Sequence, residues 1–276
     1  NNRTFLEKSV PQIVQAILSE GGVTADLRLQ VNYPARKFVV QYRESDFAVI
    51  SRLMEEEGMY YFFEQSDQGH RLVIADTPAG HTEIPGSVQF DNSAQLGIAG
   101  AAPDRVISWE KNQEIRSAKY TLWDHCFELP GSHLEATATI QSGVQVGKVF
   151  HKFQISGNDK LEVYDFPGGY AGRFDGVDPA GRAQPQELAK LAQESKRVTV
   201  GAMQTETVGA MQMRGVSSAR QLVAGHKFTL SGHYDADGPY VLTGVQHSAT
   251  RGAGETLQYG NGFTCIPAAV PFRPAR

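Results

Sequence analysis

The sequence predicts an α+β protein that is mostly β, with small β-barrel modules and an inserted helix–hairpin subdomain. Helical spacing of apolar residues appears twice near the start of the chain, over residues 10–18 and 47–54. From residue 105 onward, short β-branched or alternating runs are separated by turn residues. Strands at such spacing favour a barrel or a sandwich over a parallel sheet with alternating helices.

The first helix is expected to begin after Ser9. Gln12 follows Ser9 at the spacing of a capping box, and Pro11 suits the first helical turn. The glycines at 21–22 are expected to end the helix, because glycine adopts the left-handed conformation of a helix terminus without steric cost. The apolar stripe of this helix consists of Val10, Ile13, Val14, Ile17 and Leu18.

A second helix is expected after a strand over residues 36–42. Ser45 or Asp46 is predicted to cap this helix, and Gly58 is predicted to end it. The predicted buried face consists of Phe47, Ile50, Leu53 and Met54.

An aromatic hairpin is predicted directly after this helix. Residues 59–63 (MYYFF) form its first strand, the polar residues 64–69 its turn, and residues 71–75 its second strand. Because aromatic residues occupy both faces of the first strand, we expect both faces to be covered.

Charged residues gather around the second helix. The acidic run at 55–57 opposes the helix macrodipole, so we expect a solvated face that meets a basic neighbour. Arg43 and Glu44, together with Arg52, are expected to fix this helix–hairpin wedge by charge-assisted hydrogen bonds.

Four segments are expected along the chain. Residues 1–93 form the helix–helix–hairpin subdomain, the Gly- and Ala-rich stretch 94–104 is a crossing segment, and residues 105–260 form a domain rich in β-barrel strands. Residues 261–276 contain three prolines and show neither a helical nor an alternating pattern of apolar residues. They are therefore interpreted as an extended linker towards a further domain.

The domain over 105–260 is expected to hold one helix and several short strands. The helix lies near residues 186–196, with Leu188, Leu191 and Ala192 facing inward. A hairpin is expected to pair residues 226–233 with 240–250. The other predicted strands cover residues 105–110, 117–124, 161–164 and 197–201.

The composition excludes some classes of protein. A chain of 276 residues with 41% hydrophobic residues can bury a core, and its net charge of −4 disfavours a nucleic-acid binder. Cys126 and Cys265 lie far apart without a framework spacing, which favours assembly in a reducing cytoplasm. The sequence shows neither a cleaved signal peptide nor an apolar run long enough to span a bilayer.

No constellation of catalytic residues is apparent in the sequence. The nucleotide-binding motifs GxGxxG and GxxxxGK[ST] and the nucleophile motif GxSxG are absent. His125 and Cys126 are neighbours, but adjacent residues of a strand point to opposite faces, so this pair is unsuited to joint catalysis. We expect no enzyme activity and assign no catalytic residue.

No metal or cofactor site is assigned either. His226, His233 and His247 lie on two strands of one hairpin, but zinc would require further converging ligands that the spacing does not supply. The Asp235–Asp237 pair is interpreted as part of a turn. The aromatic run at 60–63 lacks interleaved basic residues, so core packing is favoured over a platform for stacking bases or sugars.

Residues 33–76 carry the most specific pattern in the chain. The string QYRESDF, followed by ISRLMEEEGMYYFF, resembles the signature of the VgrG family, the spike components of type VI secretion systems. Further motifs occur in family order and extend the resemblance over nearly the whole chain. They are SVPQIVQAIL, VISWEK, KYTLWD, EVYDFPGGY, GHKFTLSGHY and FTCIPAAVPFRPAR.

This resemblance implies a phage tail hub-like fold and a mechanical role. Family members form the homotrimeric base of the spike, where two related β-barrel modules per chain give a ring that matches the hexameric Hcp tube. The resemblance further implies an OB-fold and a needle capped by a PAAR protein beyond Arg276, contacts with baseplate proteins, and effector delivery. The β-rich stretch usual at the start of the family is missing, so the first barrel is expected to be incomplete.

Such a hub is expected to assemble in the bacterial cytoplasm and to be secreted to the extracellular space or a target cell. One alternative is the hub of a contractile phage tail or tailocin, which the neighbouring genes would distinguish. A second is an enzyme such as a cell-wall hydrolase, which would require a helical insert with a catalytic glutamate that the sequence does not show.

Overall fold

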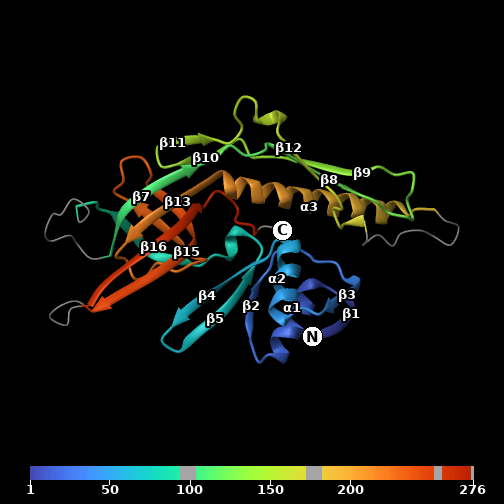
Figure 1. Ribbon diagram of the computed structural model, residues 1–276, viewed down its shortest axis with the longest axis horizontal. Coiled ribbons are helices and arrows are strands. Elements are labelled where there is room, and N and C mark those ends of the chain that lie inside the picture. The colour runs from blue at the N-terminus through green and yellow to red at the C-terminus, as the bar shows by residue number, and fades with distance from the viewer. Residues whose placement is uncertain (94–103, 172–181, 252–256, 275–276) are drawn as a thin grey trace.

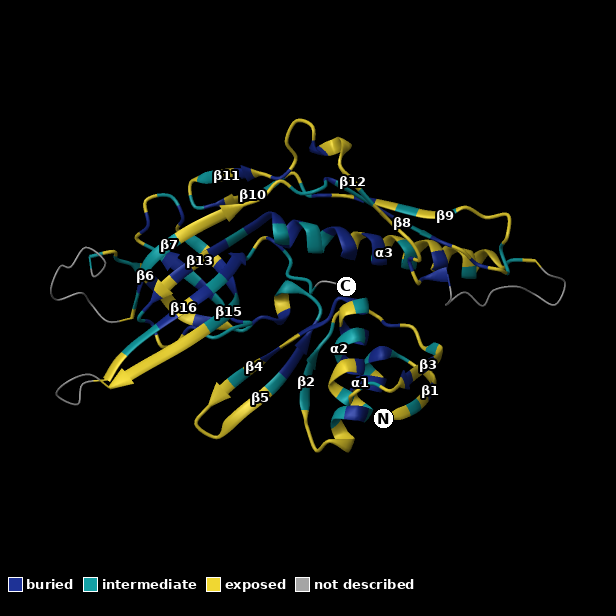
Figure 2. Cartoon of the chain, viewed as in Figure 1, coloured by how far each residue is buried: buried dark blue, intermediate teal, exposed yellow. Residues whose placement is uncertain are grey.

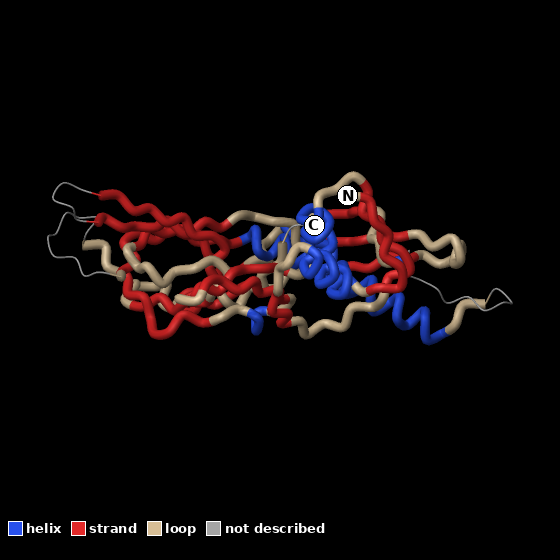
Figure 3. Tube along the Cα trace, turned by 90° about the horizontal axis from the view of Figure 1, so that it is seen from below, coloured by secondary structure: helices blue, strands red, loops and turns tan. Residues whose placement is uncertain are grey.

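The computed structural model describes residues 1–93, 104–171, 182–251 and 257–274, so the predicted crossing segment lies outside the described residues except for Asp104. The molecule is elongated, with a β-barrel at one end and the long helix α3 along its middle (Figure 1). A unit of helices and strands from the first part of the chain lies beside α3. From below, the barrel strands stand apart from these N-terminal helices (Figure 3).

The N-terminal unit packs two helices between two sets of strands. Helices α1 and α2 lie between the antiparallel ribbon β1–β3 and a sheet of strand order β2-β5-β4 (Figure 1). Phe5, Val39 and Ile74 join the apolar faces of both helices in one core. The elements are β1 (Asn2–Lys8), α1 (Val10–Glu20), β2 (Ala25–Arg28), β3 (Arg36–Tyr42), α2 (Asp46–Glu57), β4 (Tyr60–Ser66) and β5 (Gly69–Ala75).

Both predicted helices are confirmed, and their caps lie where the sequence places them. The Gln12 side chain accepts a hydrogen bond from the Ser9 backbone N–H at 2.9 Å, and the Ser45 hydroxyl accepts one from the N–H of Ala48 at 3.1 Å. Gly58 ends α2 with a φ of 77°. After α1, the left-handed residue is Gly22, with a φ of 70°.

The predicted buried face of α2 is right for three residues and wrong for Phe47. Phe47 lies in the first turn and is 65% exposed, whereas Val49 is fully buried beside the predicted Ile50, Leu53 and Met54. The Phe47 ring instead meets the Tyr61 ring edge-on, with 6.5 Å between the ring centroids.

The aromatic hairpin β4–β5 is confirmed, but the prediction that both faces of its first strand are covered is wrong. Tyr60 and Phe62 are buried, whereas Tyr61 and Phe63 are 43% and 39% exposed. The reason is the strand order: β4 is the outer strand, and the helical core reaches the neighbouring β5 and β2.

A closed barrel forms the other end of the molecule, with strand order β13-β16-β15-β14-β6-β7. Strand β6 comes from the segment predicted as part of the first subdomain, so residues 83–90 leave that subdomain and pair with β14 and β7. Figure 2 shows how the barrel buries its inner residues. Its strands are β6 (Glu83–Phe90), β7 (Arg105–Gln113), β13 (Met211–Ser217), β14 (Lys227–Ser231), β15 (Gly238–Arg251) and β16 (Leu257–Pro267).

The prediction of an extended linker over residues 261–276 is wrong for its first part. Residues 261–267 belong to β16, which pairs with both β15 and β13. Cys265 and Ile266 are fully buried there, and Val270 is buried just beyond the strand. The prolines suggested an extended linker, but the first of them, Pro267, is the last residue of the strand and does not interrupt it.

Helix α3 (Pro185–Ala210) is much longer than predicted, and it includes residues 197–201, which the sequence predicted as a strand. The β-branched run was misleading because Val198 and Thr199 are buried on the same side as Leu191, so tertiary packing overrides propensity. The predicted inward position is right for Leu191 and wrong for Leu188 and Ala192, which are both exposed. Strand β13 begins at the next residue, with no loop between helix and strand.

A three-stranded sheet of order β12-β8-β9 covers α3 on the side away from the N-terminal unit (Figure 1). Leu122 of β8 and the buried Tyr170 pack against Leu191 and Val198 of α3. The remaining elements are the 3₁₀ turns Pro78–Gly80 and Asn158–Lys160 and the strands β8 (Lys119–Asp124), β9 (Leu134–Thr139), β10 (Gly143–Val146), β11 (Val149–Lys152) and β12 (Glu162–Asp165).

The charged wedge contains part of the expected contacts. Arg52 donates two hydrogen bonds to the Glu44 carboxylate, at 3.1 and 2.9 Å, and these hold the pKa of Glu44 below its usual range. The Arg43 guanidinium lies over the Tyr42 ring, 5.2 Å from its centroid. Arg52 therefore carries the ion pair of the wedge, and Arg43 makes a cation–π contact.

A buried carboxylate joins the N-terminal unit to α3. The Glu57 side chain is 2% exposed and accepts hydrogen bonds from Arg36 of β3 and Arg197 of α3, both at 2.5 Å. The Arg197 guanidinium also lies 5.8 Å from the centroid of the Tyr33 ring. The acidic end of α2 was predicted as a solvated face against a basic neighbour. The basic neighbours are present, but Glu57 itself is buried.

Replacing Glu57 by Gln is expected to lower the free energy of unfolding by roughly 3 kcal/mol, because two partly buried guanidinium groups lose their shared counter-charge. Urea unfolding of the variant and the parent protein measures this difference. Glu55→Gln is the matched control, since Glu55 is exposed on the same turn. Equal losses in the two variants would contradict this role of Glu57.

Candidate functional site

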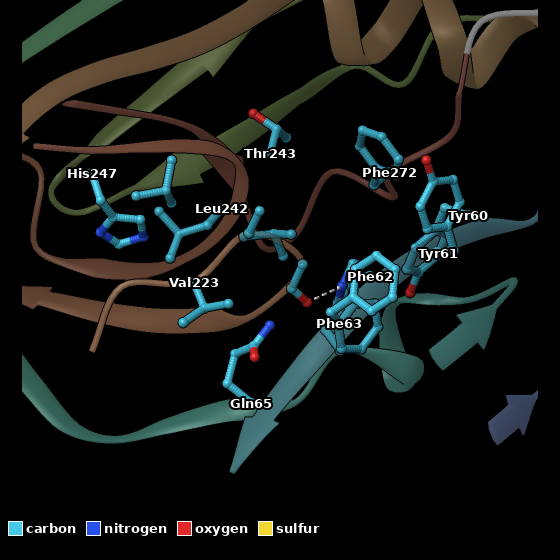
Figure 4. A pocket seen from close by; sticks show the side chains of 15 residues that line it. Tyr60, Tyr61, Phe62, Phe63, Gln65, Val223, Leu242, Thr243, His247 and Phe272 are labelled. Atoms are coloured by element: carbon cyan, nitrogen blue, oxygen red, sulfur yellow. Dashed lines mark hydrogen bonds between the residues drawn. The ribbon is translucent and has the colours of Figure 1, made fainter. Parts of the chain in front are cut away.

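A groove of about 400 Å³ separates the hairpin β4–β5 from the barrel. We call it the β4–β15 groove, after the two strands that flank it (Figure 4). Aromatic residues form one wall and aliphatic barrel residues the other. The lining residues are Tyr60, Tyr61, Phe62, Phe63, Gln65, His81, Val223, Ala224, Gly225, Val241, Leu242, Thr243, Val245, His247 and Phe272.

Strand β4 presents its outer edge to this groove. Four consecutive residues, 60–63, line the cavity. Successive side chains of a strand point to opposite faces, so a cavity that touches all four lies along the edge of the strand. The strand order agrees, since β4 pairs with β5 alone among the described strands.

Strand β15 flanks the groove from the barrel side, and its edge is unpaired beyond residue 242. It pairs with β16 along most of its length, but its pairing with β14 covers residues 238–241 alone. Leu242 makes the last backbone contacts on that side, with Gly225 and His226. Beyond Leu242, no described strand covers this edge, and Thr243, Val245 and His247 line the groove.

His81 lies between the two walls and is held as a neutral imidazole. Its Nδ1 lies 2.8 Å from the carbonyl oxygen of Gly225, so Nδ1 carries the proton and donates. Its ring stacks on Tyr60, with 4.6 Å between the centroids. Burial lowers the pKa of His81 to about 4.

The other ring nitrogen of His81, Nε2, is a buried acceptor for which the described residues supply no hydrogen-bond partner. An unsatisfied buried acceptor costs about 1–3 kcal/mol. Gly225 fixes the approach of the walls, because it has a φ of 82° and a Cβ there would lie 2.2 Å from the Cβ of Phe62. The groove therefore offers apolar contact and one hydrogen-bond acceptor.

The three histidines named in the sequence do not converge on one site. His226 packs edge-on against Phe62, His233 accepts hydrogen bonds from the N–H groups of Asp235 and Ala236, and the Nδ1 of His247 lies 2.6 Å from the hydroxyl of Tyr259. Within the described ranges, no three His, Cys, Asp or Glu residues are placed to hold a metal ion.

The remaining residues singled out in the sequence have structural positions. Cys126 is buried and His125 is exposed, although both lie just beyond the end of β8 and not on a strand. Asp237 accepts a hydrogen bond from the N–H of His233 at 2.7 Å, which fits the predicted turn. Burial raises the pKa of the Cys265 thiol well above its usual range.

Sequence reasoning missed the groove. The aromatic run at 60–63 was noticed and assigned to a core, which is right for Tyr60 and Phe62. The same run also lines the β4–β15 groove, because β4 is the outer strand of its sheet. The order of strands in a sheet cannot be derived from a local sequence pattern. The unpaired nitrogen of His81 likewise depends on the approach of Gly225, which is 144 residues away in sequence.

His81 is expected to make stability depend on pH between about 4 and 6.5. In this window the unfolded chain binds a proton that the folded protein does not bind, so stability falls as the pH falls, by about 1.4 kcal/mol per unit for this group. His81→Asn keeps a donor near the Gly225 carbonyl and removes the titration. Thermal unfolding at pH 7 and pH 5 should therefore show a smaller loss in the variant; equal losses would contradict this assignment.

Among the helices that the structure describes, none combines the length and apolar character needed to cross a membrane. This finding concerns helices alone.

Comparison with known proteins gives relatives over almost the whole chain. The chain is 29% identical to the type VI secretion system spike protein VgrG5 of Pseudomonas aeruginosa, in an alignment that covers 99% of this chain and 33% of that protein. VgrG1a of the same organism is 28% identical over 98% of this chain and 39% of that protein. The chain thus spans about a third of the length of these curated relatives.

Solved structures share the fold. An E. coli component of the type VI secretion system, described as similar to the T4 bacteriophage tail proteins gp27 and gp5, matches with a TM-score of 0.52 at 18% identity, over 100% of this chain and 53% of that chain. A tail protein from Neisseria meningitidis matches with a TM-score of 0.53 at 9% identity, over 98% of this chain and 70% of that chain.

These matches confirm the predicted mostly-β, phage tail hub-like fold and the resemblance to VgrG spike proteins. The family described as phage tail baseplate hub (GPD) matches residues 1–253. The chain therefore belongs to the phage tail baseplate hub family.

Proposed function

We propose that this chain forms the hub at the base of a trimeric type VI secretion spike, docks on the Hcp tube and passes the thrust of contraction to the spike. The observation that carries the proposal is the match to VgrG spike proteins along 98–99% of the chain. A structural role in a spike or tail hub follows from the family; tube docking and force transmission are the proposed steps.

The architecture supports a mechanical role. The six barrel strands pair in a closed ring, and a 26-residue helix joins directly to one of them. The described residues hold no cluster suited to metal chemistry. We propose that the protein works without catalysis. We further propose that its partners are a PAAR protein, baseplate proteins and secreted effectors. The proposed route begins in the bacterial cytoplasm and ends outside the cell.

The hub of a contractile phage tail or tailocin is the second candidate. The fold match to the Neisseria tail protein favours it, and the family itself takes its name from a phage baseplate hub. Tail proteins match at about a third of the sequence identity of the VgrG relatives, and for this reason the type VI spike is preferred.

Deletion of the gene in a strain with no other spike gene is expected to abolish release of Hcp into the medium. Immunoblots of medium and cells measure this, and a plasmid copy should restore release. Cellular Hcp should stay constant as the control. Continued Hcp release with loss of tail-like particles would instead support the phage or tailocin hub.

The native polypeptide that carries this chain is expected to be a homotrimer. Light scattering should give three times the mass of one polypeptide, because a ring hub of this kind is held by interfaces between identical chains. A monomer at high concentration would contradict the trimeric hub.

A further inference from the structure

Residues 268–274, which follow strand β16, contact both the barrel and the N-terminal unit, and we call them the C-terminal strap. Val270 is buried in the barrel core. Phe272 packs against that core and against the cluster around Tyr60, whose ring it meets edge-on with 5.5 Å between the centroids (Figure 4). The end of the chain lies beside the N-terminal helices in both views (Figures 1 and 3).

The N-terminal unit depends on side-chain contacts for its position. Among the described residues, its strands pair with one another, in the ribbon β1–β3 and the sheet β2-β5-β4, and with no strand of the barrel. One covalent connection, residues 76–82, leads from β5 to the barrel strand β6. The unit is therefore built to move as a body about this connection when its side-chain contacts open.

Arg273 of the strap lies between the end of α2 and the middle of α3. A Cβ added at Gly58 or at Gly201 would overlap the Arg273 guanidinium. Gly58 has a second reason to be glycine, since its φ is 77°. Gly201 lies inside α3, where glycine is less favourable than alanine. The space that the guanidinium needs accounts for the missing side chain at position 201.

The charge around this seat favours a cation. Helix α2 ends in three glutamates, and its last turn contains no basic residue. Glu57 is paired with Arg36 and Arg197, which leaves the carbonyl end of the helix dipole to be compensated. Arg273 brings a positive charge to this end of α2 from the last residues of the chain.

We propose that the C-terminal strap is a releasable fastening: seated Arg273 holds the N-terminal unit on α3, and its withdrawal lets the unit open about residues 76–82. Residues 271–274 belong to no helix or strand, so they can leave the seat without breaking a sheet. The Thr205 hydroxyl of α3 donates a hydrogen bond to the Pro274 carbonyl at 3.4 Å, which such a withdrawal also breaks. This inference does not rest on the proposed function, because it concerns a motion within one chain.

Spin labels on Asp67→Cys and Lys196→Cys measure the opening, since Asp67 lies in the turn of the hairpin β4–β5 and Lys196 is exposed on α3. Cys126 and Cys265 are buried and do not compete for the label. Pulsed electron paramagnetic resonance should show one short distance in the parent chain. Arg273→Ala is expected to raise the fraction of a longer distance at least about tenfold, the scale of one charge-assisted contact.

Gly201→Ala is the second variant, and it separates the strap from helix propensity. Alanine in the interior of a helix should by itself raise the folding equilibrium constant about fivefold. At position 201 its Cβ meets the far end of the Arg273 side chain, so it should displace the guanidinium and increase the longer distance. Combined with Arg273→Ala, it should add nothing further, because the seat is already empty.

Gly209→Ala is the matched control, because Gly209 lies in the same helix beside Arg116 and away from the strap. It should leave the distance unchanged. An unchanged distance in both Arg273→Ala and Gly201→Ala would overturn the proposal. Additive effects of the two substitutions, or an equal effect of Gly209→Ala, would show a general loosening of α3 and would overturn it as well.

Discussion

The arrangement of the whole molecule depends on one buried carboxylate whose charge is balanced by arginines. Glu57 ends α2 inside the protein, and its charge is compensated by one arginine from its own unit and one from α3. A buried charge without partners is very costly, so this contact fixes where α3 lies on the N-terminal unit. That placement also positions β4 against the barrel. The groove between β4 and β15 begins close to this ion pair, because Tyr60, the first residue of β4, follows Glu57 by three positions.

Local patterns were sufficient for both helices, β3 and the hairpin β4–β5 of the N-terminal unit, whereas β1 and β2 were not predicted. The caps at Ser9 and Ser45, the glycine at 58 and the hairpin β4–β5 all rest on contacts between residues close in sequence. The motif run over residues 33–76 also pointed to the family that the comparisons confirm. These features are local, and local propensity and spacing are what a single sequence states directly.

The misjudged elements depend on partners far away in the chain. Residues 197–201 are β-branched, yet they are helical because Val198 packs with Leu122 and Tyr170. Residues 261–267 become a barrel strand because β13 and β15 lie on either side of them. The groove and the orphan nitrogen of His81 have the same origin, since each arises where separate sheets approach one another. The pattern of apolar residues within a short stretch of sequence gives no information about which distant sheets come into contact.

The junction between α3 and β13 has a mechanical consequence. Ala210 ends the helix and Met211 begins a strand that is hydrogen-bonded on both sides within the barrel. A loop at this point would act as a joint; here the helix is instead a lever arm of about 39 Å, at 1.5 Å per residue, set rigidly into the barrel wall. A twist applied anywhere along α3 must therefore either turn the barrel with it or break the strand from its neighbours.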